Sequence, residues 1–98
     1  MKKDKTKWSH KHDFPDGEVW ETYNVIARQI VPRLRAFRAL DKHGYPEALG
    51  SMDEWNKALD KMIYAFEQVM YIPLMPEYRK AFDEGFALFC KYYLYLRD

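Results

Sequence analysis

Apolar residues recur every three or four positions in three segments of the chain, which is the spacing of one face of an α-helix. The pattern predicts helices from about Glu18 to Leu40 or Lys42, from Ser51 to about Tyr71, and from about Glu77 to Leu96. We therefore expect an all-α fold, a compact bundle of three main helices that forms a single domain over residues 14–98.

The first helix is expected to pack through one stripe and to bend in its middle. Pro32 removes the hydrogen bond to the Arg28 carbonyl and clashes with the preceding turn, so a kink is predicted there. We expect Asp16 to cap the start of this helix and Gly44 to close its end in the left-handed conformation. The residues expected to face the core are Tyr23, Ile26, Ile30, Leu34 and Phe37.

The second helix has the clearest signals for its ends and its buried face. Ser51 and Glu54 have the spacing of a capping box, in which the serine hydroxyl accepts a hydrogen bond from a backbone N–H of the first turn. Pro73 stops the helix. The expected inner stripe is Trp55, Leu59, Met62, Phe66 and Val69.

The third helix is apolar over about half of its circumference. Gly85 lies in its middle, where glycine costs about 1 kcal/mol relative to alanine, so a neighbouring helix is expected to approach closely there. The broad arc and the outlying Leu94 predict homo-oligomerisation through this helix. Cys90 is interpreted as a small buried or interfacial hydrophobe. The expected inward residues are Tyr78, Phe82, Phe89, Tyr93 and Leu96.

Composition restricts the class of protein. The formal net charge of +1 gives no general attraction for nucleic acid, and no apolar run reaches the roughly 18 residues that a membrane span needs. The single cysteine permits no internal disulfide, which favours a reducing cytoplasm. Aromatic residues make up 17% of the chain, more than a three-helix core needs, and aromatic side chains are enriched at interfaces.

The charges fall into blocks along the chain. Residues 1–12 carry five lysines and residues 1–13 are expected to form a mobile polar arm. Residues 13–27 carry four acids and no base, whereas residues 28–42 carry five bases against Asp41. We expect these blocks to offset one another within the fold or across an oligomer.

Signatures of catalysis are missing from the sequence. There is no glycine-rich phosphate loop, no His-Glu-x-x-His motif and no Glu-x-x-His pair of a di-metal bundle. His10 and His12 lack a further ligand nearby, and a polar tail explains them better than a metal site. We therefore predict a protein that is not an enzyme and that has no cofactor and no metal.

Arginines of the first helix are the candidate anion-binding residues. Arg33 falls at the edge of the apolar stripe beside Pro32, where its guanidinium could grip a phosphate together with Arg28 and Arg35. The alternative is structural: Arg33 extends along the surface or pairs with an acid of the second helix.

Tyr64 and Tyr71 form a second aromatic stripe on the second helix, on the side opposite its core-facing residues. They are flanked by Asp60 and Glu67. Exposed aromatic residues grouped with acids suggest either a partner surface or the base-stacking part of a ligand site.

From Phe14 onward, over about four fifths of its length, the chain resembles a family of small helical proteins of tailed bacteriophages and prophages. It departs from that pattern after Trp20 and at Arg97. The resemblance implies a phage origin and action in the cytoplasm of an infected bacterium, and it carries over no catalytic residue. The matching residues are Phe14, Asp16, Trp20, Ile30-x-Pro32-x-Leu34-x-x-Phe37, Tyr45-Pro46, Trp55-x-x-x-Leu59-x-x-Met62-Ile63-x-Ala65-Phe66-Glu67 and Glu84-Gly85-x-x-Leu88-Phe89-x-Lys91-Tyr92.

Three functions agree with these features. The first is counter-defence, in which arginines and tyrosines of a homo-oligomer bind and sequester a nucleotide-derived immune signal. The second is an adaptor or inhibitor that binds a host protein. The third is a structural or accessory component of the virion.

Overall fold

The computed structural model of the protein describes residues 13–71 and 75–98, and over these residues it contains helices and no β-strand. The three main helices are α1 (Thr22–Ala39), α2 (Met52–Tyr71) and α3 (Pro76–Lys91). Short 3₁₀ helices, η1 (Asp16–Glu21), η2 (Glu47–Leu49) and η3 (Tyr93–Tyr95), precede α1, precede α2 and follow α3. The prediction of an all-α fold with three main helices is confirmed.

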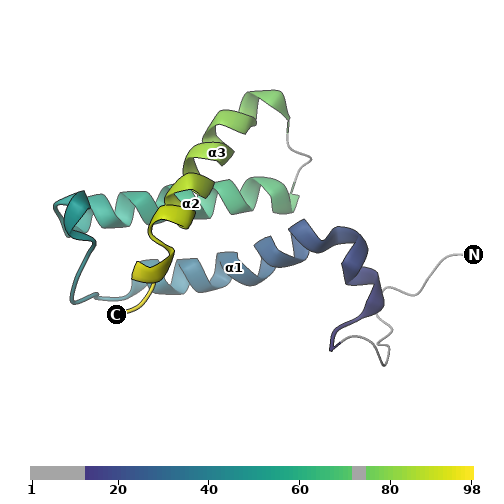
Figure 1. Ribbon diagram of the computed structural model, residues 1–98, viewed down its shortest axis with the longest axis horizontal. Coiled ribbons are helices and arrows are strands. Elements are labelled where there is room, and N and C mark those ends of the chain that lie inside the picture. Colours follow the sequence, from purple (N-terminus) through teal and green to yellow (C-terminus); the bar gives the residue numbers. More distant parts are fainter. Residues whose placement is uncertain (1–12, 72–74) are drawn as a thin grey trace, which may run out of the picture.

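The helices are arranged around α2. Helices α1 and α2 lie side by side and antiparallel, and α3 crosses α2 (Figure 1). Helix α2 packs against both of its neighbours, whereas the backbones of α1 and α3 make no close contact with each other. The bundle is therefore open on the side where α1 and α3 diverge.

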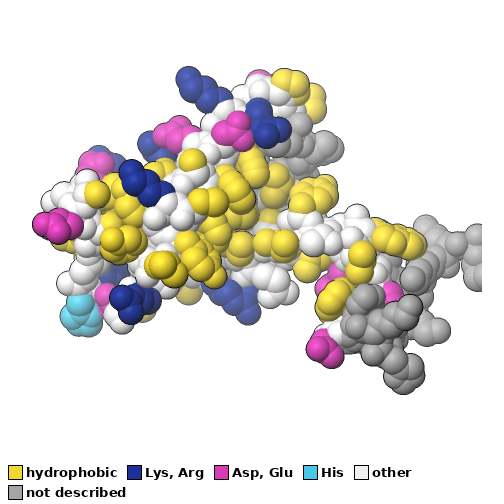
Figure 2. All heavy atoms as spheres, viewed as in Figure 1, with side chains coloured by type: hydrophobic (Ala, Val, Ile, Leu, Met, Phe, Trp, Pro, Cys, Tyr) yellow, Lys and Arg dark blue, Asp and Glu magenta, His cyan; other side chains and the backbone are white. Residues whose placement is uncertain are grey.

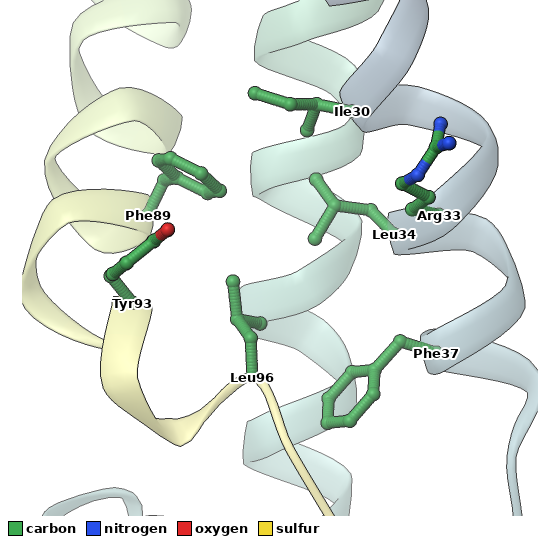
Figure 3. A pocket seen from close by; sticks show the side chains of 7 residues that line it. All are labelled: Ile30, Arg33, Leu34, Phe37, Phe89, Tyr93 and Leu96. Carbon is green, nitrogen blue, oxygen red and sulfur yellow. The ribbon is translucent and has the colours of Figure 1, made fainter.

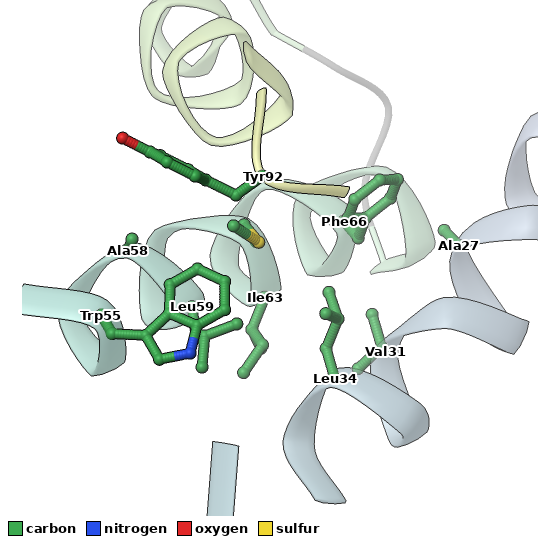
Figure 4. Close-up of a cluster of buried hydrophobic side chains, with 10 residues drawn as sticks. Ala27, Val31, Leu34, Trp55, Ala58, Leu59, Ile63, Phe66 and Tyr92 are labelled. Atoms are coloured by element: carbon green, nitrogen blue, oxygen red, sulfur yellow. The ribbon is translucent and has the colours of Figure 1, made fainter. Parts of the chain in front are cut away.

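The core lies between these helices (Figure 4). The Trp55 indole is buried at its centre, where it makes edge-on ring contacts with Phe37 of α1 and with Tyr92 at the end of α3. Of the predicted α2 stripe, four residues are buried and Val69 is partly buried, as expected. The buried apolar residues are Ala27, Val31, Leu34, Trp55, Ala58, Leu59, Met62, Ile63, Ala65, Phe66 and Tyr92.

The predicted inward stripe of α1 is wrong in its N-terminal half. Tyr23 is 64% exposed and Ile26 is 48% exposed, while Ala27 and Val31 face the core. Contacts with α2 set this rotation: the Asn24 amide donates to the Val69 and Met70 carbonyls at 3.1 and 3.3 Å. The N-terminal half of α1 therefore faces α2 through the residues that follow the predicted ones, whereas the predicted Leu34 is buried as expected.

The ends of α1 also differ from the prediction. Asp16 does not cap α1, because it lies in the first turn of η1, where its Oδ1 is buried without a hydrogen-bond partner among the described residues. Gly44 is not left-handed; the glycine with positive φ is Gly50, at 84°. Instead the Lys42 ammonium donates to the carbonyls of Phe37, Arg38 and Leu40 at 3.0–3.4 Å. Lys42 is only 8% exposed, and burial lowers its pKa from the usual 10.5.

Two predictions about the starts and crossings of helices are confirmed. The Ser51 hydroxyl accepts a hydrogen bond from the Glu54 backbone N–H at 3.1 Å. A Cβ at Gly85 would lie 2.3 Å from the Lys61 carbonyl oxygen and 2.6 Å from the Ala65 Cβ. Glycine is therefore required where α3 crosses α2.

Helix α3 ends earlier than predicted. It stops at Lys91, and η3 turns the chain, so that Tyr93 is 58% exposed and not inward. Cys90 is exposed in the single chain and not buried. Pro32 lies inside α1, and the kink there stays a prediction. The predicted arm, apart from Asp13, lies outside the described residues, as do His10, His12 and Pro73.

Candidate functional site: an apolar groove between α1 and α3

An apolar groove of about 290 Å³ lies where α1 and α3 diverge over α2. Apolar side chains of α1 form one wall, and side chains of α3 and of the turn after it form the other (Figure 3). The side chains of Ile30, Leu34 and Leu96 point toward the space between the walls. The lining residues are Ile30, Arg33, Leu34, Phe37, Phe89, Tyr93 and Leu96.

The walls are held by aromatic contacts with the core. The Phe37 ring meets Trp55 at a centroid distance of 6.2 Å, and the Phe89 ring meets Phe66 of α2 at 5.0 Å. Tyr93 packs edge-on against Phe89 at 5.5 Å. Because both walls rest on α2, the groove is a preformed feature of the fold and not a gap between loose segments.

Arg33 is the one charged residue in the lining of this groove. Its Nη1 donates to the Gln29 carbonyl oxygen at 2.7 Å and to Gln29 Oε1 at 3.2 Å, so the guanidinium lies along the α1 wall (Figure 3). The structural alternative had two forms: the ion pair between Arg33 and an acid of α2 is not formed, whereas extension of the side chain along the surface agrees with the position of the guanidinium. Glu67 pairs with Arg35, and Asp60 pairs with Arg38 at 2.9 Å.

The other predicted site residues with described side chains, Arg28, Arg35 and Tyr64, do not line the groove with Arg33. Arg35 lies at the α1–α2 edge in its ion pair with Glu67, and Arg28 is exposed and has no ion pair within the described part of the chain. Tyr64 is exposed on α2, one helical turn before Glu67. The backbone of Tyr71 ends α2, and its side chain is outside the described part. Of the four candidates whose side chains the structure describes, only Arg33 lines the groove.

The apolar residues that build the groove are predicted from the sequence as core residues. Phe37, Phe89, Tyr93 and Leu96 belong to stripes that would be buried in a closed bundle. The breadth of the apolar arc on the third helix was the signal that these residues exceed what one neighbour can cover.

Hydrophobic side chains continue beyond the groove on the same face. Figure 2 shows them spreading from the region between α3 and α1 toward the N-terminal part of α1. Exposed apolar patches of this kind are typical of surfaces that bind another protein. The large apolar residues exposed on α1 and its flanks include Val19, Tyr23, Ile26 and Leu40, and those at and after the end of α3 include Phe86, Tyr93, Leu94 and Tyr95.

A polar contact ties the end of the chain to the loop after α1. The His43 backbone N–H donates to Asp98 Oδ1, and His43 Nδ1 lies 2.8 Å from Asp98 Oδ2. These hydrogen bonds lower the pKa of Asp98 from its usual 3.8. The contact joins the loop that follows α1 to the segment that follows α3, and so closes one end of the molecule.

Other kinds of site have little support in the described residues. No three histidine, cysteine, aspartate or glutamate side chains among them are grouped so that they could hold a metal ion. No helix in the described part of the chain is both long and apolar enough to cross a membrane.

Comparisons with protein-family models, curated proteins and solved structures found no match to this chain. The fold and the site together define an all-α protein with three main helices and an open apolar groove. The resemblance to phage proteins stays a prediction from the residues.

Proposed function

We propose that the protein is a non-enzymatic binding protein whose groove between α1 and α3 receives an apolar helix. The observation that carries this proposal is the arrangement of the groove: two helical walls, a helical floor, and an apolar lining with a single charge. A helix that packed between α1 and α3 would complete a four-helix bundle, in which the apolar faces of all helices are buried.

The chemistry of the lining favours a helix over a highly charged ligand. Burial of a charge is unfavourable unless the charge is paired, and Arg33 is the only cation among the described residues that line the groove. The Arg33 guanidinium already donates hydrogen bonds to the backbone oxygen and the side-chain oxygen of Gln29. An amphipathic helix would instead place leucine- or phenylalanine-sized anchors between Phe37 and Phe89 and leave its polar face in water.

The resemblance to phage proteins supplies a setting for this activity. In an infected bacterium, the occupant of the groove would be a helix of a host protein, which the phage protein inhibits, or a helix of the protein itself. Both cases need the same groove, so one experiment tests the activity before the partner is known.

Photo-crosslinking tests the proposal directly. The photoreactive residue p-benzoylphenylalanine replaces Tyr93 at the groove or, as the control, Tyr64 on the outer side of α2. Both tyrosines are exposed, so neither replacement disturbs the core. We expect an adduct with a polypeptide in cells from Tyr93 and none, or a much weaker one, from Tyr64. No adduct from Tyr93 with any polypeptide, including a second copy, would refute the proposal.

A second candidate function is favoured by one observation, the presence of Arg33 in the lining of a groove that also contains aromatic rings. If the guanidinium left Gln29, it could bind a phosphate while Phe37, Phe89 or Tyr93 stacked on a base, as required for sequestering a nucleotide-derived immune signal. A thermal-shift screen with cyclic dinucleotides and cyclic ADP-ribose isomers tests this, since a bound ligand raises the melting temperature. Arg33→Ala should abolish the shift, whereas Arg28→Ala, on the same helix but outside the groove, should keep it.

A further inference from the structure

An apolar stripe of α1, exposed in its N-terminal half and partly buried in its C-terminal half, is symmetric about Ile30. Tyr23 and Phe37 lie seven residues before and after it, and Ile26 and Leu34 lie four residues before and after it. At 100° per residue, these five positions share one face of the helix. A helix pairs with its own copy in the antiparallel direction when its contact pattern reads the same both ways, because in a twofold interface residue i contacts j and j contacts i.

The two halves of this stripe have complementary surroundings. The N-terminal half is exposed among the described residues: Tyr23 is 64% exposed and Ile26 is 48% exposed. The C-terminal half, with Leu34 and Phe37, forms a wall of the groove. An antiparallel pairing about Ile30 lays the free half of each α1 over the groove half of the other, and so covers both.

The charges support the same pairing. The rotation about Ile30 brings the N-terminal end of one α1 to the C-terminal end of the other, so that residues 13–27 of one chain lie at the same end of the dimer as residues 33–47 of the other. The first segment has four acids and no base, and the second has four bases and two acids. Opposite blocks therefore meet, and the antiparallel direction also sets the two helix dipoles favourably. The acids are Asp13, Asp16, Glu18 and Glu21, and the charged residues of the second segment are Arg33, Arg35, Arg38, Asp41, Lys42 and Glu47. Arg35 and Arg38 are also paired with Glu67 and Asp60 of their own α2, so Arg33 is the base of this segment without an ion pair in the described part of the chain that lies on the groove side.

From this geometry we infer that the helix received by the groove is α1 of a second copy, in a twofold dimer whose axis passes near Ile30. The inference rests on the proposed function, because it names the occupant of the same groove. It differs from oligomerisation through the third helix, which would centre on Leu94. Leu94 is 79% exposed and is not part of the groove lining.

Cysteine crosslinking tests the direction and register of the pairing. All variants carry Cys90→Ser, which removes the single native cysteine. Ile30→Cys should form a disulfide-linked dimer under mild oxidation, because residue 30 meets its own copy. Ala36→Cys, an exposed position of α1 outside the stripe, is the matched control and should stay uncrosslinked.

A mixing experiment separates the antiparallel from the parallel arrangement. Tyr23→Cys and Phe37→Cys should each crosslink poorly alone and efficiently when mixed, since residue 23 of one chain meets residue 37 of the other. Crosslinking of Tyr23→Cys with itself would mean a parallel pair and would overturn the inference. Far-ultraviolet melting curves confirm that each variant is folded.

Sedimentation of the full chain gives the decisive measurement of assembly. The parent should sediment at twice the chain mass of 11.9 kDa. Ile26→Asp, at a surface position, should weaken the dimer at least about tenfold with little change in helicity, because a central apolar contact is replaced by a charge. Leu94→Asp should leave the dimer unchanged.

The outcomes distinguish this inference from the proposed function. A monomeric parent at high micromolar concentration, with an adduct from position 93 to a different protein, overturns the dimer and keeps the binding groove. Dissociation by Leu94→Asp but not by Ile26→Asp assigns the dimer to the third helix and also overturns the inference. The absence of any adduct refutes the groove as a binding site and the dimer with it.

Discussion

Helix α3 meets its two neighbours in opposite ways. Where it crosses α2, the helices approach so closely that a methyl group at Gly85 would overlap the Lys61 carbonyl oxygen at 2.3 Å. Toward α1 it makes no close backbone contact, and the apolar groove separates the two helices. Helix α3 thus packs tightly against α2 and is separated from α1 by a groove. We call these the closed side and the open side of α3.

The residues at the two contacts explain the difference. Small residues, Gly85 and Ala65, let the α2 and α3 backbones approach each other. On the open side, rings of Phe37 and Phe89 fill the space near α2 and keep the walls apart. The comparison shows that apolar surface alone does not close a bundle. The sizes of the side chains decide which pairs of helices can reach contact distance.

Trp55→Ala should lower the stability of the fold most, because the indole packs against both α1 and the end of α3. The indole is buried and touches Phe37 on the open side and Tyr92 at the end of α3. Removal of a buried aromatic side chain lowers the free energy of unfolding by about 3–5 kcal/mol. Urea denaturation followed by circular dichroism measures this loss. Trp55→Phe, which keeps a ring, should lose distinctly less, and equal losses would contradict a role for the ring contacts.

Gly85→Ala tests the closed contact alone. The added methyl group meets backbone atoms of Lys61, which cannot move like a flexible side chain, and overpacking of this kind lowers the free energy of unfolding by about 1–3 kcal/mol. This loss outweighs the gain of about 1 kcal/mol in helix propensity. Gly44→Ala is the control, since no atom lies within 4 Å of its added methyl group. A stabilised Gly85→Ala protein would show that α2 and α3 are not in tight contact.

The closed side of the molecule could be predicted from the sequence, and the open side could not. The α2 stripe, the Ser51 cap and the close approach at Gly85 follow from local patterns and were confirmed. The face of α1 was wrong because α1 carries two apolar stripes one residue apart, and periodicity cannot rank them. The choice depends on long-range contacts such as those of Asn24 with the end of α2.

The end of α1 and the candidate site also depend on contacts that local sequence patterns do not predict. Gly44 had the right residue type for a left-handed cap, yet Lys42 supplies the capping donor from a folded-back side chain that no local motif encodes. Arg33 was placed correctly at the edge of the apolar surface. Its separation from Arg35 follows from helix geometry, because residues two positions apart lie on nearly opposite sides of a helix. Its separation from Tyr64 could not be predicted, because it depends on the packing of α1 and α2.

Tyr93→Ala should affect the open side while changing stability little. Tyr93 is 58% exposed, and changes at such positions typically shift the free energy of unfolding by less than about 1 kcal/mol. Its ring nevertheless forms part of the groove, so the dimer dissociation constant from sedimentation should rise severalfold. Tyr95→Ala, at a similarly exposed tyrosine outside the groove lining, is the control. Equal effects of the two variants on the dimer would contradict a role for the groove.

The smallest effect is expected at the tie between His43 and Asp98, which bridges the loop after α1 and the segment after α3. Hydrogen bonds from His43 lower the pKa of Asp98 below 3.8, so this carboxylate stabilises the fold above its unfolded-state pKa. That contribution is lost as the pH falls through the lower folded-state value. The His43 amide, which donates to the carboxylate, should therefore show a nuclear magnetic resonance shift whose midpoint lies below pH 3.8. In Asp98→Ala this titration should vanish, and the melting temperature should fall slightly near neutral pH but not in strong acid. A midpoint at or above pH 3.8 would mean that the contact does not hold the open side together in solution.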